Sequence, residues 1–295
     1  MHHFSKKVLR FVWFILMAAI CIIMIYPLIY SALGGFNSQS EFNSMGNLFP
    51  VPRKLIWNNY NFAFSSTALN PLLNTFFRTA WYTAVVLVMT VLIGYVMARY
   101  EFKGRQFFMV FIIVAQVIPS VLTLIPTFVM VSHIPLAGGN DLFGNGGRGL
   151  YDSQLMLFLP LSWGYLLWPF LFMQSMKSLS LSFEEAAELD GAGFLQTILR
   201  VIVPMQKPIL TVVAINVALN TWNDWMTPFL YINSTRKTTL PAYLATLTAS
   251  LQNYGQKDYP KVFALATLAI IPPLLIFLFL QKYIVQGIAS AGIKE

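Results

Sequence analysis

Four residues interrupt an apolar stretch near its end: Asn220, Trp222, Asn223 and Asp224. Their amide and carboxylate groups can donate and accept hydrogen bonds to a hydroxyl-rich ligand, and the ring of Trp222 or Trp225 offers a stacking face. An ionisable side chain in an apolar segment is costly and therefore suggests a functional site. The same residues could instead form a polar network between helices, or Asp224 could lie near the outer interface. The pattern leaves these interpretations open.

An acidic cluster between two apolar stretches, Phe183 to Gly191, is the second candidate. Four of the eleven acidic residues lie at positions 184–190. Ser182 and Glu185 match a capping box, in which the Ser hydroxyl accepts from the amide of residue 185 and the Glu reaches back to the amide of Ser182. Acidic residues in the first turn favour the helix dipole. The cluster therefore predicts a short helix in water that Gly191 ends.

A second short helix is predicted over residues 194–202, with its apolar residues on one face at helical spacing. These residues are Leu195, Ile198, Leu199 and Ile202. Pro204 disfavours helical geometry at Val203 and predicts a turn back toward the membrane. The hairpin could lie on the bilayer as an amphipathic loop, but anionic lipid headgroups repel acidic faces. We therefore favour docking onto another protein.

The composition is that of a membrane protein. Hydrophobic residues make up 57% of the chain and charged residues 10%, and the mean hydropathy is +0.65. A soluble domain would have about 25% charged residues. We predict an all-α polytopic fold with one transmembrane domain over residues 1–295 and six spans, each an apolar stretch long enough to cross a bilayer. The predicted spans are about 9–33, 72–98, 106–131, 153–176, 206–232 and 262–286, and the acidic hairpin lies at about 177–205.

The net charge of +8 follows the predicted membrane topology. Cytoplasmic loops are enriched in Lys and Arg, and a cytoplasmic N-terminus places eleven basic residues on that side against eight on the other. The short segments that discriminate best hold Lys6, Lys7 and Arg10, and Arg99, Lys103 and Arg105. We predict that both termini are cytoplasmic. Because the sequence has no basic stripe with interleaved aromatic residues, nucleic acid is excluded as a partner.

Other patterns predict no cofactor site in this chain. The N-terminal apolar stretch is longer than that of a signal peptide, so it is expected to remain as a helix. Cys21 is the single cysteine, and His133 stands alone, so neither a disulfide nor a metal site is expected. Residues 144–149 match G-x-G-x-x-G, but no strand precedes them and no Lys-Ser/Thr follows, so the match predicts no nucleotide site.

The hairpin sequence resembles the EAA signature of ABC importer permeases. It reads Glu185-Ala186-Ala187, three residues, Gly191, nine residues, then Val201-x-Val203-Pro204, with Val where the family usually has Ile and Leu. The string at 185–192 is similar to the carbohydrate-uptake branch. Residues 222–225 with Pro228, and the tail at 287–294, are similar to the subunit class typified by the second permease of the maltose transporter. The resemblance covers nearly the whole chain from about residue 70.

This resemblance implies a type I ABC importer fold in a bacterial cytoplasmic membrane, with the hairpin seated in a groove of an ATP-binding subunit. Glu185 would pair with a basic residue there, Ala186 and Ala187 would allow close packing, and Gly191 would make the bend. The other expected coupling residues are Glu184, Asp190 and Pro204. The implied partners are two ATP-binding subunits, a second non-identical permease, an extracytoplasmic solute-binding protein and membrane lipid. ATP and Mg would be bound by the partner subunits, and transport would proceed by alternating access.

Other functions fit the sequence less well. A membrane-embedded enzyme would need paired acids or a metal cluster at membrane depth, where the sequence offers Asp224 alone. Channels and secondary carriers usually carry inverted repeats or several intramembrane charges. An ABC permease for a non-sugar solute is the nearest alternative. The sugar itself stays open, either neutral or acidic such as a uronate oligomer.

The residues at 220–224 have a second interpretation. In the resembled maltose system the partner permease holds the sugar, so the residues at 220–224 could simply line the path. Trp163, Tyr165 and Trp168 are weaker candidates, because core packing or an interfacial aromatic belt explains such residues more often.

Overall fold

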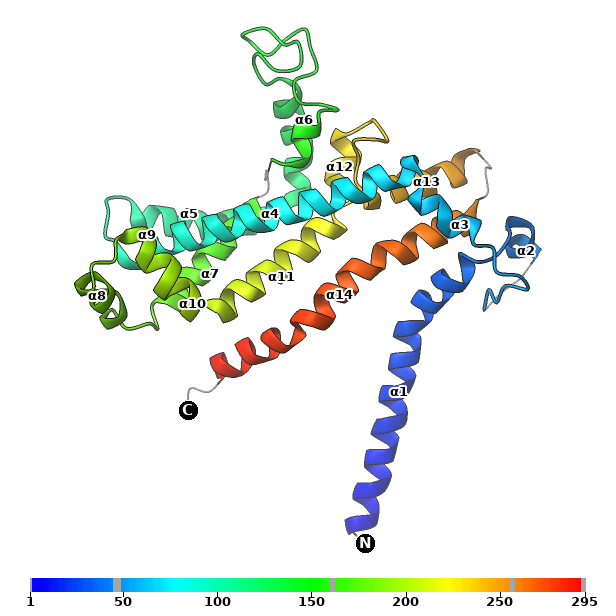
Figure 1. Cartoon of the computed structure of the whole chain (residues 1–295), viewed down its shortest axis with the longest axis horizontal. Helices are drawn as coiled ribbons and strands as arrows, with labels where there is room; N and C mark the ends of the chain where they lie inside the picture. The colour runs from blue at the N-terminus through cyan, green and yellow to red at the C-terminus, as the bar shows by residue number, and fades with distance from the viewer. Residues whose placement is uncertain (1, 45–48, 160–162, 255–257, 293–295) are drawn as a thin grey trace. The chain divides into compact units, whose positions relative to one another are not determined.

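The computed structural model describes residues 2–44, 49–159, 163–254 and 258–292 and contains only helices and irregular segments over these ranges (Figure 1). The predicted all-α fold class is therefore confirmed. The chain divides into two compact units, Met1–Leu69 with Leu244–Pro272, and Asn70–Tyr243 with Pro273–Glu295. The single domain over 1–295 stays a prediction.

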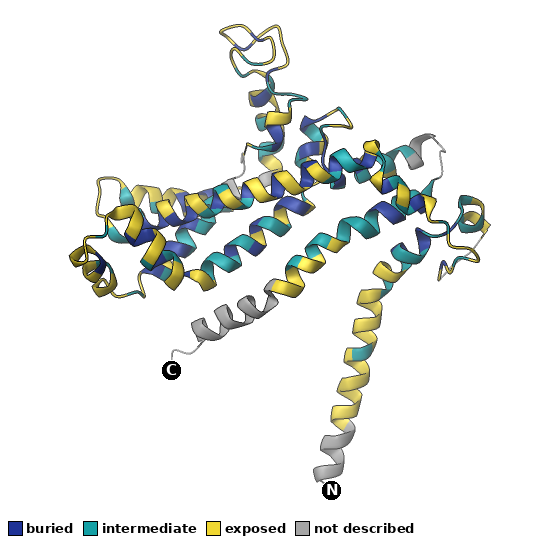
Figure 2. Ribbon diagram, in the orientation of Figure 1, coloured by how far each residue is buried: buried dark blue, intermediate teal, exposed yellow. Residues whose placement is uncertain are grey.

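The first unit contains a long apolar helix, α1 (His2–Gly34). In the stretch Leu9–Gly34, with mean hydropathy 2.7, none of the most apolar 18-residue window is buried (Figure 2). Near its end, the Ser31 hydroxyl donates to the carbonyl of Phe263 on α14 (Tyr259–Gly292) at 3.1 Å. A helix of this length and polarity is suited to lipid or to another membrane helix.

Short elements follow α1 in the same unit, namely α2 (Gln39–Ser44) and α3 (Asn58–Asn61). The side-chain Nδ2 of buried Asn59 donates to the carbonyls of Gly35 and Asn37, at 3.0 and 2.9 Å. These bonds order the segment between the long helices α1 and α4 (Ser66–Arg99).

The second unit has its core between α4, α7 (Leu167–Met176) and α11 (Lys207–Asn223). Phe172 on α7 is fully buried, and a Cβ on Gly94 of α4 would come within 2.8 Å of its ring. Small residues allow helices to approach closely in membranes. Gly94 therefore sets the close packing of α4 against α7.

Fewer helices than predicted pass as spans by length and apolarity. Among the residues that the structure describes, three qualify, or five if each of two sharply bent pairs counts as one span: Arg105–Val117 with Val121–Ser132, and Phe194–Met205 with Lys207–Asn223. The predicted span at 153–176 contains short helices at Gln154–Leu157 and Trp163–Leu166 and then α7, with residues 160–162 outside the described ranges. The number six stays a prediction.

The predicted span at 206–232 is not one continuous helix. α11 ends at Asn223, Asp224 has extended backbone (φ −70°, ψ 97°), and α12 (Met226–Tyr231) starts a new helix. This unit also contains α5 (Arg105–Val117), α6 (Leu124–Ser132) and the start of α13 (Leu240–Tyr254).

Candidate functional site

Helix α8 (Ser182–Leu189) ends in a Schellman motif. Gly191 has φ +80°, its N–H donates to the carbonyl of Glu188, and the N–H of Ala192 donates to that of Ala187, both at 2.9 Å. Together these bonds satisfy carbonyl groups at the helix end. The bend at Gly191 therefore depends on a left-handed conformation that other residues rarely adopt.

The predicted capping box of Ser182 and Glu185 is wrong. α8 already includes Ser182, and the carbonyl of Leu181 accepts from the amides of Glu184 and Glu185 at 2.9 and 3.0 Å. The Ser182 hydroxyl instead shares a 2.8 Å hydrogen bond with that of Ser180. Because the helix begins one residue earlier than the motif requires, a backbone carbonyl replaces the side-chain cap.

Glu184 and Glu185 face different surroundings. The Glu184 carboxylate accepts from Tyr95 Oη at 2.8 Å and from Arg99 Nε at 2.6 Å, and the Arg99 and Glu184 side chains are only 10% and 13% exposed. Arg99 Nη2 also donates to the Leu179 carbonyl at 3.0 Å. We call Tyr95, Arg99 and Glu184 the hairpin clamp, because they fasten α8 to the end of α4. Glu185 is exposed.

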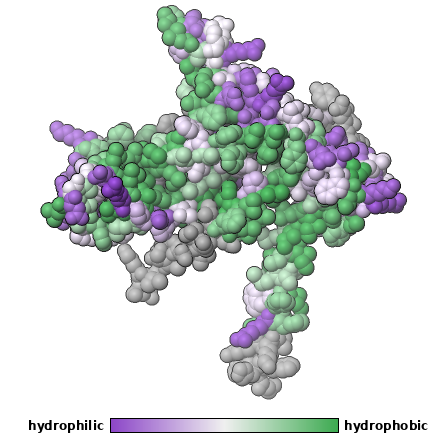
Figure 3. Space-filling model, in the orientation of Figure 1, coloured by the Kyte–Doolittle hydropathy of each residue, from purple (hydrophilic) through white to green (hydrophobic). Residues whose placement is uncertain are grey.

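Three of the remaining expected coupling residues, together with Leu189, form an exposed surface at the end of α8, which we call the docking face after the role expected of it. Its members are Glu185, Ala186, Leu189 and Asp190, all of them exposed. Leu189 is 90% exposed, whereas Ala187 is buried. Hydrophilic residues gather over this end of the unit, beside apolar helix surfaces (Figure 3).

The predicted helix over 194–202 is α9 (Phe194–Thr197) followed by a π-helical turn, Ile198–Ile202. Ile198 and Ile202 are buried in the core of the second unit, but Leu195 and Leu199 are 60% and 64% exposed. The single apolar face is therefore wrong. The wider π turn changes the register between successive turns, and such turns often occur at functional sites.

The predicted turn at Pro204 is displaced to Gln206. Val203 is helical, and Pro204 lies at the start of the short helix α10 (Val203–Met205), where a proline is tolerated. The chain bends by 84° between this segment and α11. Buried Gln206 stands at the bend, where its side-chain oxygen accepts from the hydroxyl of Ser175 on α7 at 2.6 Å.

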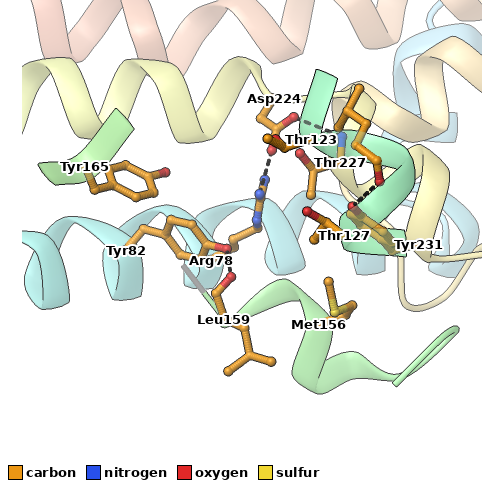
Figure 4. Close-up of a pocket in the computed structure, with 11 residues that line it drawn as sticks. Arg78, Tyr82, Thr123, Thr127, Met156, Leu159, Tyr165, Asp224, Thr227 and Tyr231 are labelled. Atoms are coloured by element: carbon orange, nitrogen blue, oxygen red, sulfur yellow. Dashed lines mark hydrogen bonds and ion pairs between the residues drawn. The ribbon is translucent and has the colours of Figure 1, made fainter. Parts of the chain in front are cut away.

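An ion pair within the second unit forms the other candidate site (Figure 4). Arg78 Nη2 on α4 donates to Asp224 Oδ2 at 2.6 Å, with the two side chains 3% and 25% exposed. Arg78 also stacks over the Tyr82 ring, 4.9 Å from its centroid. The other carboxylate oxygen, Asp224 Oδ1, accepts from the amide of Thr227 at 3.1 Å, which caps the start of α12. Asp224 therefore joins α4 to the break between α11 and α12.

The ion pair lines a cavity of about 90 Å³. Its other polar lining residues are Tyr82, Tyr165, Tyr231, Thr123, Thr127 and Thr227, and its apolar ones are Leu124, Met156 and Leu159 (Figure 4). Helices α4, α6 and α12, the short helices Gln154–Leu157 and Trp163–Leu166, and the break at Asp224 supply most of these side chains. The arrangement can exchange hydrogen bonds with a polar group beside aromatic and aliphatic walls.

The predicted substrate-path residues differ in their burial and in whether they line the cavity. Asp224 lines the cavity, Trp222 is buried with 3% exposure, and Asn220 and Asn223 are exposed and do not line the cavity. Sequence reasoning missed Arg78, although it falls inside the predicted span at 72–98 and the cost of intramembrane charge could have identified it.

The three weaker aromatic candidates also differ. Tyr165 and Trp168 both pack against the buried cluster of Tyr82, Val86, Val213 and Val217, and of these two only Tyr165 also lines the cavity. The side chain of Trp163 lies outside the described residues.

Asp152 connects two loops outside the predicted spans. Its carboxylate accepts from the Asn233 amide at 3.1 Å and from the amide and hydroxyl of Ser234 at 2.9 and 2.6 Å. Lys237 Nζ lies 3.4 Å from Asp152 Oδ2. Burial raises the pKa of the Asp152 carboxyl, but the bonds from Ser234 and Asn233 and the charge of Lys237 outweigh it, so this pKa is below its usual value.

Replacing Asp152 by Asn should therefore reduce stability most at neutral pH. The lowered pKa in the folded state means that the carboxylate stabilises the fold above its unfolded pKa of about 3.9, and that this contribution disappears as the pH falls through the folded value. Asn also tolerates the positive φ of 54° at this position. Thermal melting from pH 7 to pH 3 should show the two proteins converging at acid pH; a constant difference would contradict the charge effect.

The chain is similar to known proteins over most of its length. Residues 90–290 match the family described as binding-protein-dependent transport system inner membrane component. The chain is 27% identical over 284 residues to the arabinooligosaccharides transport system permease protein AraQ of Halalkalibacterium halodurans, covering 94% of each chain. It is 30% identical over 275 residues to the probable ABC transporter permease protein YurM of Bacillus subtilis, covering 91% of this chain and 83% of that one.

A solved structure is similar along almost the whole chain. It is the crystal structure of a bacterial ABC transporter involved in the import of the acidic polysaccharide alginate, with a TM-score of 0.73 and 22% identity. The likeness covers 95% of this chain and 97% of the other, so the two share one fold.

Proposed function

This chain belongs to the family of binding-protein-dependent transport system inner membrane components, and on that premise we propose that it is a permease subunit of an ATP-driven oligosaccharide importer. The family and the shared fold confirm the predicted ABC importer permease. The oligosaccharide substrate is supported by a relative named for arabinooligosaccharide transport, which matches over 94% of its length. Alternating access around a path between helices would move the sugar into the cytoplasm.

The mechanism rests on the hairpin, because one side of it is bonded to the rest of the permease and the other side is exposed. The hairpin clamp fastens α8 to α4, while the docking face stays exposed. An ATP-binding subunit that seats this face would pair a basic residue with Glu185 and would pack on Ala186 and Leu189. Movement of that subunit would then reach α4 through the clamp.

The proposed assembly contains two ATP-binding subunits, a second and non-identical permease, and an extracytoplasmic solute-binding protein, all working at the bacterial cytoplasmic membrane. ATP and Mg would bind to the ATP-binding subunits, and this chain would carry no catalytic site or cofactor. Both termini would lie in the cytoplasm, because that orientation places the clustered basic residues near 6–10 and 99–105 on the inner side. Lipid would cover the exposed apolar surface of the helices.

Purification of the intact complex tests this assembly. We expect native mass spectrometry of the complex, extracted with its lipid, to show one copy of this chain, one different permease and two ATP-binding subunits. Proteoliposomes with the solute-binding protein should take up oligosaccharide only when ATP is supplied. A homodimer that transports without any ATP-binding subunit would overturn the proposal.

Replacing Gly191 by Val should uncouple ATP hydrolysis from uptake. At φ +80° a residue other than Gly costs about 1–2 kcal/mol, and a β-branched residue is especially unfavourable, so the hairpin should lose its bend. Gly193→Val is the matched control, because Gly193 has φ −76° and ψ 170° and a Cβ there would meet no described atom within 4 Å. In proteoliposomes, Gly191→Val should lose more uptake than ATPase activity, so less sugar is transported for each ATP hydrolysed. Gly193→Val should keep the wild-type ratio of uptake to ATPase activity. Equal uptake by the two variants would contradict a role for the bend.

A further inference from the structure

The cavity at the ion pair has no net charge. Arg78 and Asp224 are its charged lining residues and neutralise each other at 2.6 Å. The remaining lining consists of tyrosine, threonine, leucine and methionine side chains. An arriving carboxylate would therefore meet one cation that is already paired, and it would lie beside the carboxylate of Asp224. Like charges in such a desolvated place repel strongly.

The cavity can exchange hydrogen bonds in both directions. Arg78 Nε is buried and has no hydrogen-bond partner among the described residues, so it keeps one donor in reserve. The Asp224 side chain is 25% exposed, so its carboxylate, which has room for about four hydrogen bonds, can accept more than the two that it receives from Arg78 and Thr227. Hydroxyl groups of a sugar are both donors and acceptors, and they match this combination of groups.

The size of the cavity suits part of a sugar. A single water needs at least about 10–15 Å³ of such space, so a cavity of about 90 Å³ has room for several hydroxyl-sized groups. That is room for one edge of a sugar ring with its hydroxyls, while the rest of an oligosaccharide would extend from the cavity mouth.

We infer, as a step that rests on the proposed function, that this cavity is a subsite for the hydroxyl groups of neutral oligosaccharides and discriminates against uronate oligomers. Asp224 would accept from sugar hydroxyls and Arg78 Nε would donate to a sugar oxygen. The ion pair would thereby bind the ligand through hydrogen bonds while the site itself keeps no net charge. The shared fold with an alginate importer does not carry its acidic substrate over to this chain, because the described residues that line the cavity include no unpaired cation.

A direct binding measurement on the importer alone distinguishes the selectivity of this subsite from that of the solute-binding protein. We would measure saturation-transfer NMR of arabinotriose, maltotriose and trigalacturonate with the detergent-solubilised importer, without its binding protein and with vanadate and ATP present. Binding of a neutral trisaccharide, with at least tenfold weaker binding of trigalacturonate, is expected. Preference for trigalacturonate would overturn the inference.

Two variants test whether the ion pair is responsible. Asp224→Asn leaves the cavity with one net positive charge and should lower the preference for neutral over acidic trisaccharide at least tenfold. Arg78→Gln with Asp224→Asn removes both charges and also the Nε donor, because the Gln side chain is shorter than that of Arg, so the assembled importer should bind neutral trisaccharide at least tenfold more weakly. Asp258→Asn removes a carboxylate from an exposed ion pair in the other unit and serves as the control.

The possible failures can be told apart. If the wild-type importer with its binding protein takes up none of the saccharides in proteoliposomes, the proposed function fails. If uptake occurs but the double variant, correctly assembled by size-exclusion chromatography, binds and transports as well as Asp258→Asn, the function stands and the subsite is refuted.

Discussion

Replacing Asp224 by Ala is expected to destabilise the folded permease by about 3–5 kcal/mol, because it leaves a buried charge without its partner. The guanidinium of Arg78 is 3% exposed and has Asp224 as its ion-pair partner, so water cannot replace the lost carboxylate easily. The change also removes the acceptor for the Thr227 amide, and loss of a helix cap costs about 1 kcal/mol. The melting temperature and yield of the purified complex should both fall.

A comparison with an exposed ion pair isolates the effect of burial. Asp258 and Lys261 lie 2.5 Å apart, but their side chains are 46% and 41% exposed, so Asp258→Ala should cost only about 0–1 kcal/mol. The double change Arg78→Gln with Asp224→Asn leaves no buried charge and should recover much of the stability lost in Asp224→Ala. If Asp224→Ala melts no lower than Asp258→Ala, the ion pair does not stabilise this unit.

The hairpin shows how far local sequence reasoning reaches. Gly191 could be assigned to the end of α8 from its residue type alone, because few other residues adopt the left-handed cap that the structure contains. The inward orientation of the Glu184 side chain could not be predicted in this way. It depends on hydrogen bonds from Tyr95 and Arg99, which lie 89 and 85 residues earlier in the chain. Likewise, the π turn at Ile198–Ile202 has no sequence signature that could have warned of the change in register.

Local sequence patterns also failed to predict the ion pair at the polar cavity, whose two residues are far apart in the chain. The cost of an intramembrane charge drew attention to Asp224 but was not applied to Arg78, which lies 146 residues earlier within the predicted span at 72–98. Trp222 looked like a stacking surface because of its residue type. Its burial follows from the way α11 packs, which a single sequence does not reveal. Residue chemistry therefore identified half of the ion pair, and tertiary packing supplied the other half.

Replacing Glu184 by Ala should separate two roles that adjacent glutamates have in the hairpin. Glu184 is 13% exposed and receives bonds from Tyr95 and Arg99, so its removal leaves the Arg99 charge buried and unpaired, at a cost of about 3–5 kcal/mol. Glu185→Ala is the matched control, since that side chain is exposed and a surface substitution usually changes stability by about 0.5 kcal/mol or less.

The two variants should therefore fail in different ways. Glu184→Ala should lower the melting temperature of the permease and loosen the hairpin, which hydrogen exchange of the α8 amides would detect. Glu185→Ala should melt like the wild type but retain less ATP-binding subunit during purification, because its carboxylate belongs to the proposed docking face. If both variants lost the ATP-binding subunit equally while melting normally, the clamp would have no separate structural role. Glu184 would then belong to the docking face with Glu185, and movement of the hairpin would have to reach α4 through apolar packing alone.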